Sequence, residues 1–191
     1  MIIGITGGTG CGKTTALSAV SQLGGLVIDC DKVYHSLLKT DPTLLAAIAD
    51  RFLGTVEAGI LNRKKLASIV FSDGQALLDL NAITHKAVKK EVLRLLENAP
   101  SLVAIDAIGL FEGDLADLCH TTVAVTAPEE VRVARLMQRD GITEKQALAR
   151  IAAQKEQNWF ISRCDHHLHN DGTQEAFYEK CMTLFKSIIL K

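Results

Sequence analysis

The sequence predicts a three-layer α/β fold in which a parallel sheet lies between two layers of helices. Its 191 residues are 48% hydrophobic, which is enough for one compact domain with a core. The candidate strands are short, continuous apolar runs, and strands that are buried on both faces have this pattern. Segments with helical periodicity separate the runs, as they do where crossover helices cover a parallel sheet.

The predicted strands are Met1–Thr6, Leu26–Asp29, Leu102–Asp106 and Thr122–Thr126. The first is rich in isoleucine and stops at a cluster of glycines. A helix is predicted at Lys13–Leu23, because its apolar pattern ends at two consecutive glycines, a typical helix stop.

The segment between the second and third strands is too long for an ordinary crossover and has helical periodicity throughout. Leu44, Ile48 and Phe52 share one helical face, and Gln75–Leu96 is a long amphipathic stretch. Its polar side carries Lys86, Lys89, Lys90 and Arg94. We therefore expect a helical insertion at this place in the chain.

Residues 7–14 read GGTGCGKT and match the pattern G-x-x-x-x-G-K-[ST], directly after a predicted strand and before a predicted helix. Glycines let the backbone wrap closely, so that its N–H groups form a nest for phosphate oxygens. The helix that follows adds N–H donors and the positive end of its dipole. Lys13 would neutralise the β- and γ-phosphates, and Thr14 would offer its hydroxyl to Mg²⁺. The segment is therefore predicted to bind a nucleoside triphosphate.

Two classes of function fit such a loop: phosphoryl transfer to a small molecule, and a nucleotide-dependent switch. The N-K-x-D element typical of guanine switches does not occur in the sequence. A kinase needs a carboxylate near the acceptor hydroxyl. Asp29 and Asp31 end the second predicted strand, and ligands of open α/β sheets bind beyond the carboxyl ends of strands. Either aspartate could instead be only a helix cap.

A lid is predicted from two consecutive helices in the second half of the chain. Pro128 opens the first, which breaks at Asp140-Gly141, and Thr143 opens the second with capping-box spacing. Most cations on these helices are expected to lie on a solvated face. Arg139, beside the break, and Arg150 are the candidates to reach the triphosphate.

Composition limits the partners. Lys plus Arg is 21, Asp plus Glu is 22 and aromatic residues are 5%, which argues against a nucleic-acid surface. No apolar run is long enough for a membrane span, and the N-terminus lacks the basic region of a signal peptide. The five cysteines form no CxxC pair, which suits a reduced cytoplasmic protein.

A cluster of histidines at residues 165–169 suggests a metal site at first sight. If the segment is a short strand, alternation places His166 and Leu168 on one face and His167 and His169 on the other. Such a split forms no tetrahedral ligand set, so we expect no metal there.

The chain resembles the dephospho-coenzyme A (dephospho-CoA) kinase family in a series of motifs, in order GITGGTGCGKTT, VIDCD, LNRKKLASIVF, ITH, LFE, RVARLMQRD and RIAAQ. The likeness runs from Ile3 to about Gly172. The loop alone is shared by many families, whereas its combination with VIDCD, the Leu-x-Arg motif and the histidine is more specific. Members of the family transfer the γ-phosphoryl group of ATP to the ribose 3′-hydroxyl of dephospho-CoA, the last step of CoA synthesis. The resemblance implies a P-loop kinase core with a helical substrate-binding insertion and a helical lid.

The resemblance also implies roles for individual residues. Asp31 matches the family's base for the 3′-hydroxyl, and Lys13 and Arg139 are the other catalytic groups. The resemblance assigns Asp29, Arg63 and His85 to substrate binding. The expected ATP-binding residues are Gly8, Thr9, Gly10, Cys11, Gly12, Lys13, Thr14, Thr15 and Arg150, of which Thr14 also binds Mg²⁺.

Three positions depart from the family pattern. Lys86 follows His85 where the family usually has proline, and IGLFE stands in place of PLLFE. Cys11 stands where a small residue such as serine is common. Inward N–H groups and Lys13 would favour a reactive thiolate at Cys11. The alternative is that Cys11 simply packs inward as a small apolar residue.

We therefore expect a Mg²⁺-dependent, cytoplasmic ATP:dephospho-CoA 3′-kinase with ATP and dephospho-CoA as partners, and with neither nucleic acid, membrane nor oligomer required. The single domain, 1–191, is expected to comprise a nucleotide core (about 1–31, 100–137 and 164–191), a substrate lobe (about 32–99) and a lid (about 138–163). The alternatives are another small-molecule or nucleoside monophosphate kinase of this fold, and a non-catalytic P-loop regulator.

Overall fold

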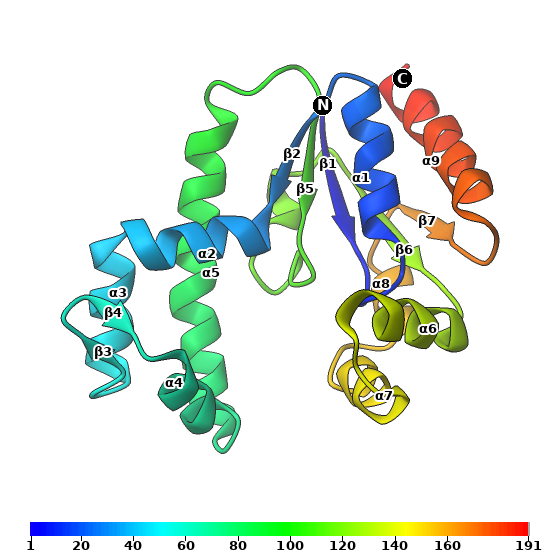
Figure 1. The fold of residues 1–191 in the computed structure, drawn as a ribbon. Coiled ribbons are helices and arrows are strands. Elements are labelled where there is room, and N and C mark those ends of the chain that lie inside the picture. Colours follow the sequence, from blue (N-terminus) through cyan, green and yellow to red (C-terminus); the bar gives the residue numbers. More distant parts are fainter. Residues whose placement is uncertain (191) are drawn as a thin grey trace. The chain divides into compact units, whose positions relative to one another are not determined.

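The computed structural model describes residues 1–190 (Figure 1). The elements are β1 (Ile2–Thr6), α1 (Lys13–Gln22), β2 (Leu26–Asp29), α2 (Cys30–Thr40), α3 (Pro42–Arg51), β3 (Val56–Glu57), β4 (Ile60–Leu61), α4 (Arg63–Val70), α5 (Gly74–Leu96), β5 (Val103–Asp106), the 3₁₀ helix η1 (Ala116–Leu118), β6 (Thr121–Thr126), α6 (Glu129–Asp140), α7 (Glu144–Ala152), α8 (Gln157–Ile161), β7 (His166–His169) and α9 (Gln174–Ile189).

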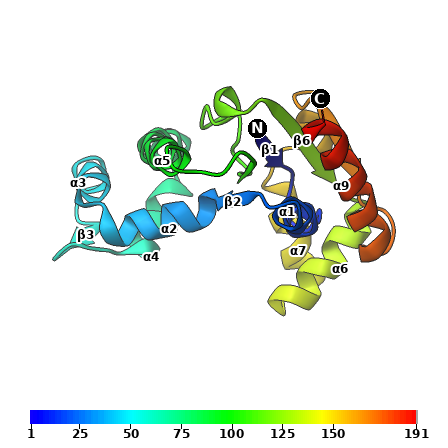
Figure 2. The same ribbon diagram turned by 90° about the horizontal axis from the view of Figure 1, so that it is seen from above.

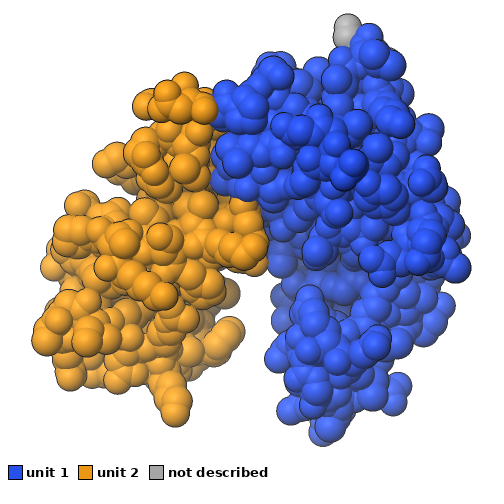
Figure 3. Space-filling view, turned by 45° about the horizontal axis from the view of Figure 1, so that its top comes forward, with its two compact units in different colours: residues 1–28, 99–110, 115–191 blue, residues 29–98, 111–114 orange. Residues whose placement is uncertain are grey.

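The chain forms two compact units, which Figure 3 colours separately. Unit 1 comprises residues Met1–Ile28, Ala99–Leu110 and the chain from Leu115 onward. Unit 2 comprises Asp29–Asn98 and the short segment Phe111–Asp114.

Unit 1 contains a five-stranded sheet with the strand order β2-β5-β1-β6-β7. β1 pairs in parallel with β5 on one side and with β6 on the other, and β6 pairs in parallel with β7. The sheet contains all four predicted strands, so the predicted fold class is confirmed. In the register, Ile5 of β1 lies opposite Asp106 of β5. The carboxyl ends of these two strands therefore lie side by side, where the glycine-rich loop begins.

The two faces of the sheet are covered differently. Ile3 and Ile5 pack into a buried cluster with α1 and α9, which lie side by side in both views (Figures 1 and 2). Side chains alternate along a strand, so Gly4 faces the opposite side. A Cβ added there would meet Cys119 and Leu110 at 2.8 and 2.9 Å. The loop that carries η1 therefore lies directly against that face of β1.

Unit 2 is the predicted helical insertion. The long helix α5 contacts α2, α3 and α4 (Figure 1). Aspartate or asparagine side chains cap the start of each of these four helices by accepting backbone N–H bonds, which favours their N-terminal turns. The caps are Asp29, Asp41, Asn62 and Asp73.

One element of unit 2 was not predicted from the sequence, the antiparallel hairpin of β3 and β4. Its turn residues, Ala58 and Gly59, have φ values of 48° and 75°. Turns of this kind usually show an Asn-Gly or Asp-Gly signature, because those residues tolerate positive φ. Alanine at the first position hides that signature, and each strand has only two residues.

Within residues 1–190, none of the helices combines the length and the apolar character that a membrane span would need.

Candidate active site

The glycine-rich loop joins β1 to α1, and backbone conformation explains its glycines. Gly7, Gly10 and Gly12 have φ values of 144°, 78° and 100°, where a side chain is strained. Space is also lacking, because a Cβ at Gly7 would overlap the carbonyl oxygen of Val125, and one at Gly12 would overlap the side chain of Asn170. The loop is therefore fixed in one tightly wrapped path.

Side chains from outside the loop hold its carbonyl groups. Arg132 donates to the Thr9 carbonyl at 2.9 Å, and Asn170 donates to the Cys11 carbonyl at 2.9 Å. Arg135 donates to the carbonyl between them, at Gly10 (3.2 Å). In a trans peptide the N–H group points away from the carbonyl that precedes it. The N–H groups that follow these carbonyls therefore point away from the arginines, which suits a phosphate nest, and that of Cys11 donates to the Gly8 carbonyl at 3.4 Å.

Arg132 and Arg135 also place positive charge beside the loop. Arg132 is only 4% exposed, and its hydrogen bonds go to two neutral oxygens, those of Thr9 and Gln154. Because both oxygens are neutral, neither of them neutralises the positive charge of the Arg132 guanidinium group. A buried cation beside a nest of N–H groups favours an anionic ligand.

Sequence reasoning missed the groups that shape the loop from outside. Most cations on the two predicted lid helices were expected on a solvated face, but Arg132 and Arg135 contact the loop, and their spacing of three residues places them on one side of α6. Gln154, in the RIAAQ motif, accepts the N–H of Thr9 at 2.7 Å. Asn170 bridges Arg135 to the loop. The recurrence of arginine at helical spacing was the signal that could have found the first two.

Lys13 and Thr14 begin α1 and lie at the mouth of the loop. The Lys13 ammonium group donates to the Gly7 carbonyl at 3.0 Å, so the side chain folds back over the loop. Thr14 is exposed and can offer its hydroxyl to a ligand. Asp106, which ends β5 beside β1, was not predicted as a site residue. Its Oδ1 atom is buried at this end of the sheet.

The structure distinguishes the two interpretations of Cys11. The residue is 1% exposed and packs in the cluster formed by α1 and α9. Burial raises the pKa of its thiol above the ordinary value, although the charges of Arg132 and Lys13 act in the opposite direction. The thiolate hypothesis is therefore wrong, and the alternative of inward packing is correct. The backbone of Cys11 remains part of the loop.

Limited treatment with iodoacetamide is expected to leave Cys11 unmodified, because the reactive thiolate is scarce and the sulfur is buried. The partly exposed Cys119 and Cys164 should be alkylated first, although burial raises their pKa values to about 12 and about 11. Peptide mapping measures the order, with denatured protein as the control in which all five cysteines react. Early, Mg-ATP-protected labelling of Cys11 would contradict the packed position.

In unit 2, the two aspartates of VIDCD have different surroundings. Asp29 caps α2 by accepting the N–H of Lys32 at 3.0 Å and also pairs with the Lys32 ammonium group at 3.0 Å. Burial raises the pKa of Asp29, but these contacts with Lys32 outweigh it and hold the pKa below the ordinary value. Asp31 lies exposed in the first turn of α2. The cap is therefore Asp29, and Asp31 is the carboxylate open to a ligand.

His85 lies on α5 in a pocket of about 530 Å³. Its Nδ1 atom is 3.1 Å from the carbonyl oxygen of Glu112. The pocket is also lined by three lysines and two acidic residues, namely Lys86, Lys89, Lys90, Glu112 and Asp114.

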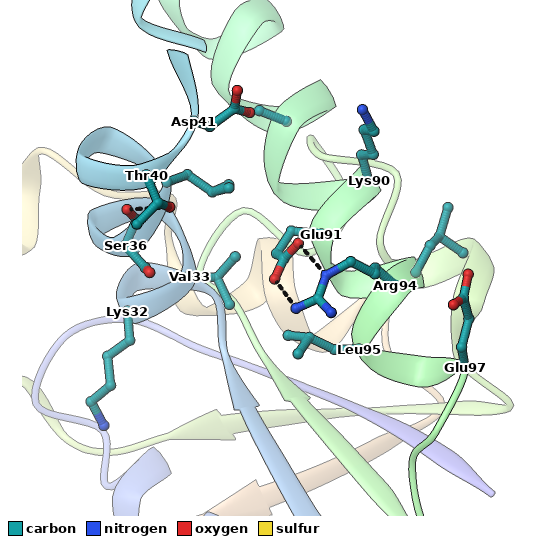
Figure 4. Close-up of a pocket in the computed structure, with 13 residues that line it drawn as sticks. Lys32, Val33, Ser36, Thr40, Asp41, Lys90, Glu91, Arg94, Leu95 and Glu97 are labelled. Atoms are coloured by element: carbon teal, nitrogen blue, oxygen red, sulfur yellow. Dashed lines mark hydrogen bonds and ion pairs between the residues drawn. The ribbon is translucent and has the colours of Figure 1, made fainter. Parts of the chain in front are cut away.

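A larger pocket of about 950 Å³ lies between α2 and the C-terminal half of α5 (Figure 4). Val33, Leu37 and Leu95 give it apolar surface, and Glu91 and Arg94 form an ion pair at 2.7 Å on its α5 side. None of the residues predicted for the site lines this pocket.

The two lid arginines share one partner in unit 1. Arg139 ends α6 and pairs with Asp140 at 2.7 Å, and Arg150 of α7 pairs with the same carboxylate at 2.6 Å. Gly141 ends α6 in the left-handed conformation, with φ 64°. The capping box predicted at Thr143 is confirmed. Whether these arginines bind ATP stays a prediction.

The histidine cluster forms β7, with the predicted alternation. His167 and His169 lie within 2.6 and 3.0 Å of the same hydroxyl oxygen, that of Thr126, while Leu168 is buried on the other face. In the described part of the chain, no group of three or more His, Cys, Asp or Glu side chains could hold a metal ion.

Comparison with known proteins identifies one family along most of the chain. The family model described as dephospho-CoA kinase matches residues 1–176. Relatives with that name include one from Syntrophotalea carbinolica, which is 34% identical over 99% of this chain and 92% of its own length. Another, from Corynebacterium jeikeium, is 35% identical over 93% of this chain and 94% of its own length.

Solved structures agree as well. A crystal structure from Thermus thermophilus has 31% identity and a TM-score of 0.83, covering 98% of this chain and 96% of its own. The dephospho-CoA kinase of Campylobacter jejuni has 26% identity and a TM-score of 0.67 over the same shares of both chains. Shikimate kinase from Bacteroides thetaiotaomicron, at 15% identity and a TM-score of 0.57, shares the fold. The family match, the relatives and the loop together establish that this chain belongs to the dephospho-CoA kinase family.

Proposed function

We propose that the protein transfers the γ-phosphoryl group of ATP to the ribose 3′-hydroxyl of dephospho-CoA, giving CoA and ADP. The observation that carries the proposal is the glycine-rich loop, fixed by Arg132, Arg135 and Asn170 in a form that suits a triphosphate, in a chain of this family. The proposal places the reaction in the cytoplasm. It needs ATP and dephospho-CoA as partners, and no nucleic acid, membrane or oligomer.

Each part of the chain has a proposed task. The loop from Gly8 to Thr15 binds the phosphates of ATP, and Lys13 neutralises charge on the β- and γ-phosphates. Asp31 accepts the proton of the acceptor hydroxyl as it attacks. The helices of residues 32–99 bind dephospho-CoA through Arg63 and His85, with Asp29 beside Asp31. The lid, residues 138–163, closes over the triphosphate and excludes water.

The residues around the loop fit a magnesium ion. Thr14, near the start of α1, offers a hydroxyl and Asp106, at the end of β5, a carboxylate, and Mg²⁺ prefers such oxygen ligands. When bound, the ion would neutralise charge on the β- and γ-phosphates. We propose these two residues as its protein ligands.

A coupled assay of ADP release tests the function. ATP is supplied alone, with dephospho-CoA, and with AMP or CMP, at equal concentrations. Turnover that depends on dephospho-CoA is the expected result. Turnover with AMP or CMP alone would indicate another kinase of this fold, and the absence of acceptor-dependent turnover would indicate a nucleotide-binding regulator.

The lid role of Arg139 leads to a separate prediction. Its exposed ion pair with Asp140 is worth little, so the guanidinium can exchange that carboxylate for a phosphate. Arg139→Ala is expected to lower kcat about 10-fold, which corresponds to about 1.4 kcal/mol of transition-state stabilisation. The dissociation constant of ATP without acceptor should stay unchanged, because the lid acts once it has closed.

Arg94→Ala is the matched control for Arg139→Ala. The side chains of Arg94 and Arg139 are 64% and 62% exposed, and each pairs with one nearby carboxylate. Steady-state kinetics and ATP titration measure both variants. Equal losses in the two variants, or a loss of ATP affinity alone in Arg139→Ala, would contradict the lid role.

A further inference from the structure

Two aromatic side chains follow Asp31 on the same side of α2. Tyr34 and His35 lie three and four residues after Asp31, and residues at these spacings are neighbours on a helix surface. The centroids of the two rings are 5.6 Å apart, and their planes are inclined by 35°. An aromatic surface therefore lies next to the carboxylate that is proposed to receive the acceptor hydroxyl.

The ring of Tyr34 is partly held in place before any ligand binds. Tyr34 is half-buried, whereas Asp31 and His35 are exposed. Burial raises the pKa of its phenol, although the positive charge of Arg63 opposes this, so the ring is neutral at physiological pH. A half-buried aromatic ring has few conformations to lose on binding and keeps one part of its surface for a partner.

The positive charge that reaches Tyr34 comes from a residue already assigned to the acceptor. Arg63 begins α4, and its charge acts on the Tyr34 phenol. Asp31, Tyr34 and Arg63 all belong to unit 2, and Asp31 and Tyr34 are neighbours on α2. A carboxylate, an aromatic ring and a guanidinium match the hydroxyl, base and phosphates of a nucleotide.

The opposite side of α2 faces a different space. The pocket in Figure 4 is lined on α2 by Lys32, Val33, Ser36, Leu37 and Thr40. It contains neither Asp31 nor Tyr34. A ligand whose reacting hydroxyl meets Asp31 therefore meets the aromatic side of α2 and not the side that faces this pocket.

Phe52 and Phe71 of unit 2 do not offer this combination, and Phe111, which is also partly buried, does not lie on α2 beside Asp31. Phe52 is 2% exposed, so it has no free face, and Phe71 is 85% exposed at the end of α4. Phe71 lacks the partial burial that would hold its ring in one orientation.

We propose that Tyr34, flanked by His35, is the stacking platform for the adenine base of dephospho-CoA. The inference rests on the proposed function, because the adenine base and the 3′-hydroxyl that is phosphorylated are attached to the same ribose. With the hydroxyl at Asp31, the base reaches the next turn of α2, where the Tyr34 ring lies. Stacking on an aromatic ring holds the nucleoside, so it contributes to acceptor binding and to the preference for a nucleotide acceptor.

The test is the affinity of Tyr34 variants for dephospho-CoA, measured by calorimetry together with steady-state kinetics. Tyr34→Ala is expected to raise the dissociation constant and KM of dephospho-CoA about 5- to 150-fold, the usual range for loss of one stacked base. KM for ATP should not change. Tyr34→Phe keeps the ring and is expected to bind as the wild type does.

Two controls separate stacking from a packing effect. Tyr34→Leu keeps apolar bulk but has no aromatic face, so it is expected to bind dephospho-CoA as weakly as Tyr34→Ala does. Phe71→Ala removes an exposed aromatic ring from the same unit and should change nothing. Inhibition by 4′-phosphopantetheine, which has no base, is expected to be equal in all variants that keep the wild-type melting temperature.

The outcomes distinguish the inference from the function on which it rests. If the wild type phosphorylates dephospho-CoA and Tyr34→Leu keeps wild-type affinity, the stacking role is overturned while the function stands. A Tyr34→Ala variant that also loses affinity for 4′-phosphopantetheine would show a general defect of the site and would equally overturn it. If the wild type does not phosphorylate dephospho-CoA at all, both proposals fail.

Discussion

Lys13→Ala is expected to lower kcat about 10²- to 10³-fold and to weaken ATP binding as well. The range is that for removing one preorganised donor from a charge that develops in the transition state. Lys13 begins α1 and lies over the loop, bonded to the Gly7 carbonyl. Its ammonium group has only to leave this neutral carbonyl to meet phosphate oxygens. Because both bound ATP and the transition state carry that charge, affinity and rate fall together.

ATP titration and steady-state kinetics measure the effect of Lys13→Ala. Lys186→Ala, at an exposed position on α9, is the control for loss of one positive charge. The melting temperature shows whether the loop survives without the bond to Gly7. Normal ATP affinity in a folded Lys13→Ala protein would mean that Lys13 only ties the loop to itself.

The fold and the loop could be predicted because their signals are local. Each predicted strand is a continuous apolar run, and the loop is a contiguous motif, three of whose four glycines have positive φ values in the structure. Such features depend on neighbouring residues in the sequence. The β3–β4 hairpin was not predicted, because the local signature of such a turn, Asn-Gly or Asp-Gly, is absent: Ala58 stands at its first position.

The contacts that shape the site depend on residues far apart in the chain, which periodicity does not reveal. Cys11 was open to two interpretations, and the packing of α9 against α1 decides that its sulfur points inward. Arg132 and Gln154 meet Thr9 across more than a hundred residues of sequence. Asp140 holds the lid arginines, which a list of cations along two helices could not show.

Asp31→Asn is expected to lower kcat about 10²- to 10⁴-fold, the usual loss when a general base is removed. The amide has nearly the same shape as the carboxylate but cannot accept the proton of the 3′-hydroxyl. ATP binding should survive, because the contacts that fix the loop come from Arg132, Arg135 and Asn170. Single-turnover kinetics with saturating ATP and dephospho-CoA measures the chemical step directly.

Two aspartates that cap helices provide the comparison for Asp31→Asn. Asp73→Asn changes the cap of α5, where Asp73 accepts the N–H of Gln75 at 2.8 Å. Asparagine caps a helix about as well as aspartate, so both stability and rate are expected to persist.

Asp29→Asn likewise keeps the cap of α2 and removes only the negative charge that pairs with Lys32. A binding role for Asp29 predicts a higher KM for dephospho-CoA in this variant, with kcat little changed. If Asp31→Asn retains near-normal turnover while Asp29→Asn loses it, the base is Asp29 and the assignment of the two carboxylates must be reversed.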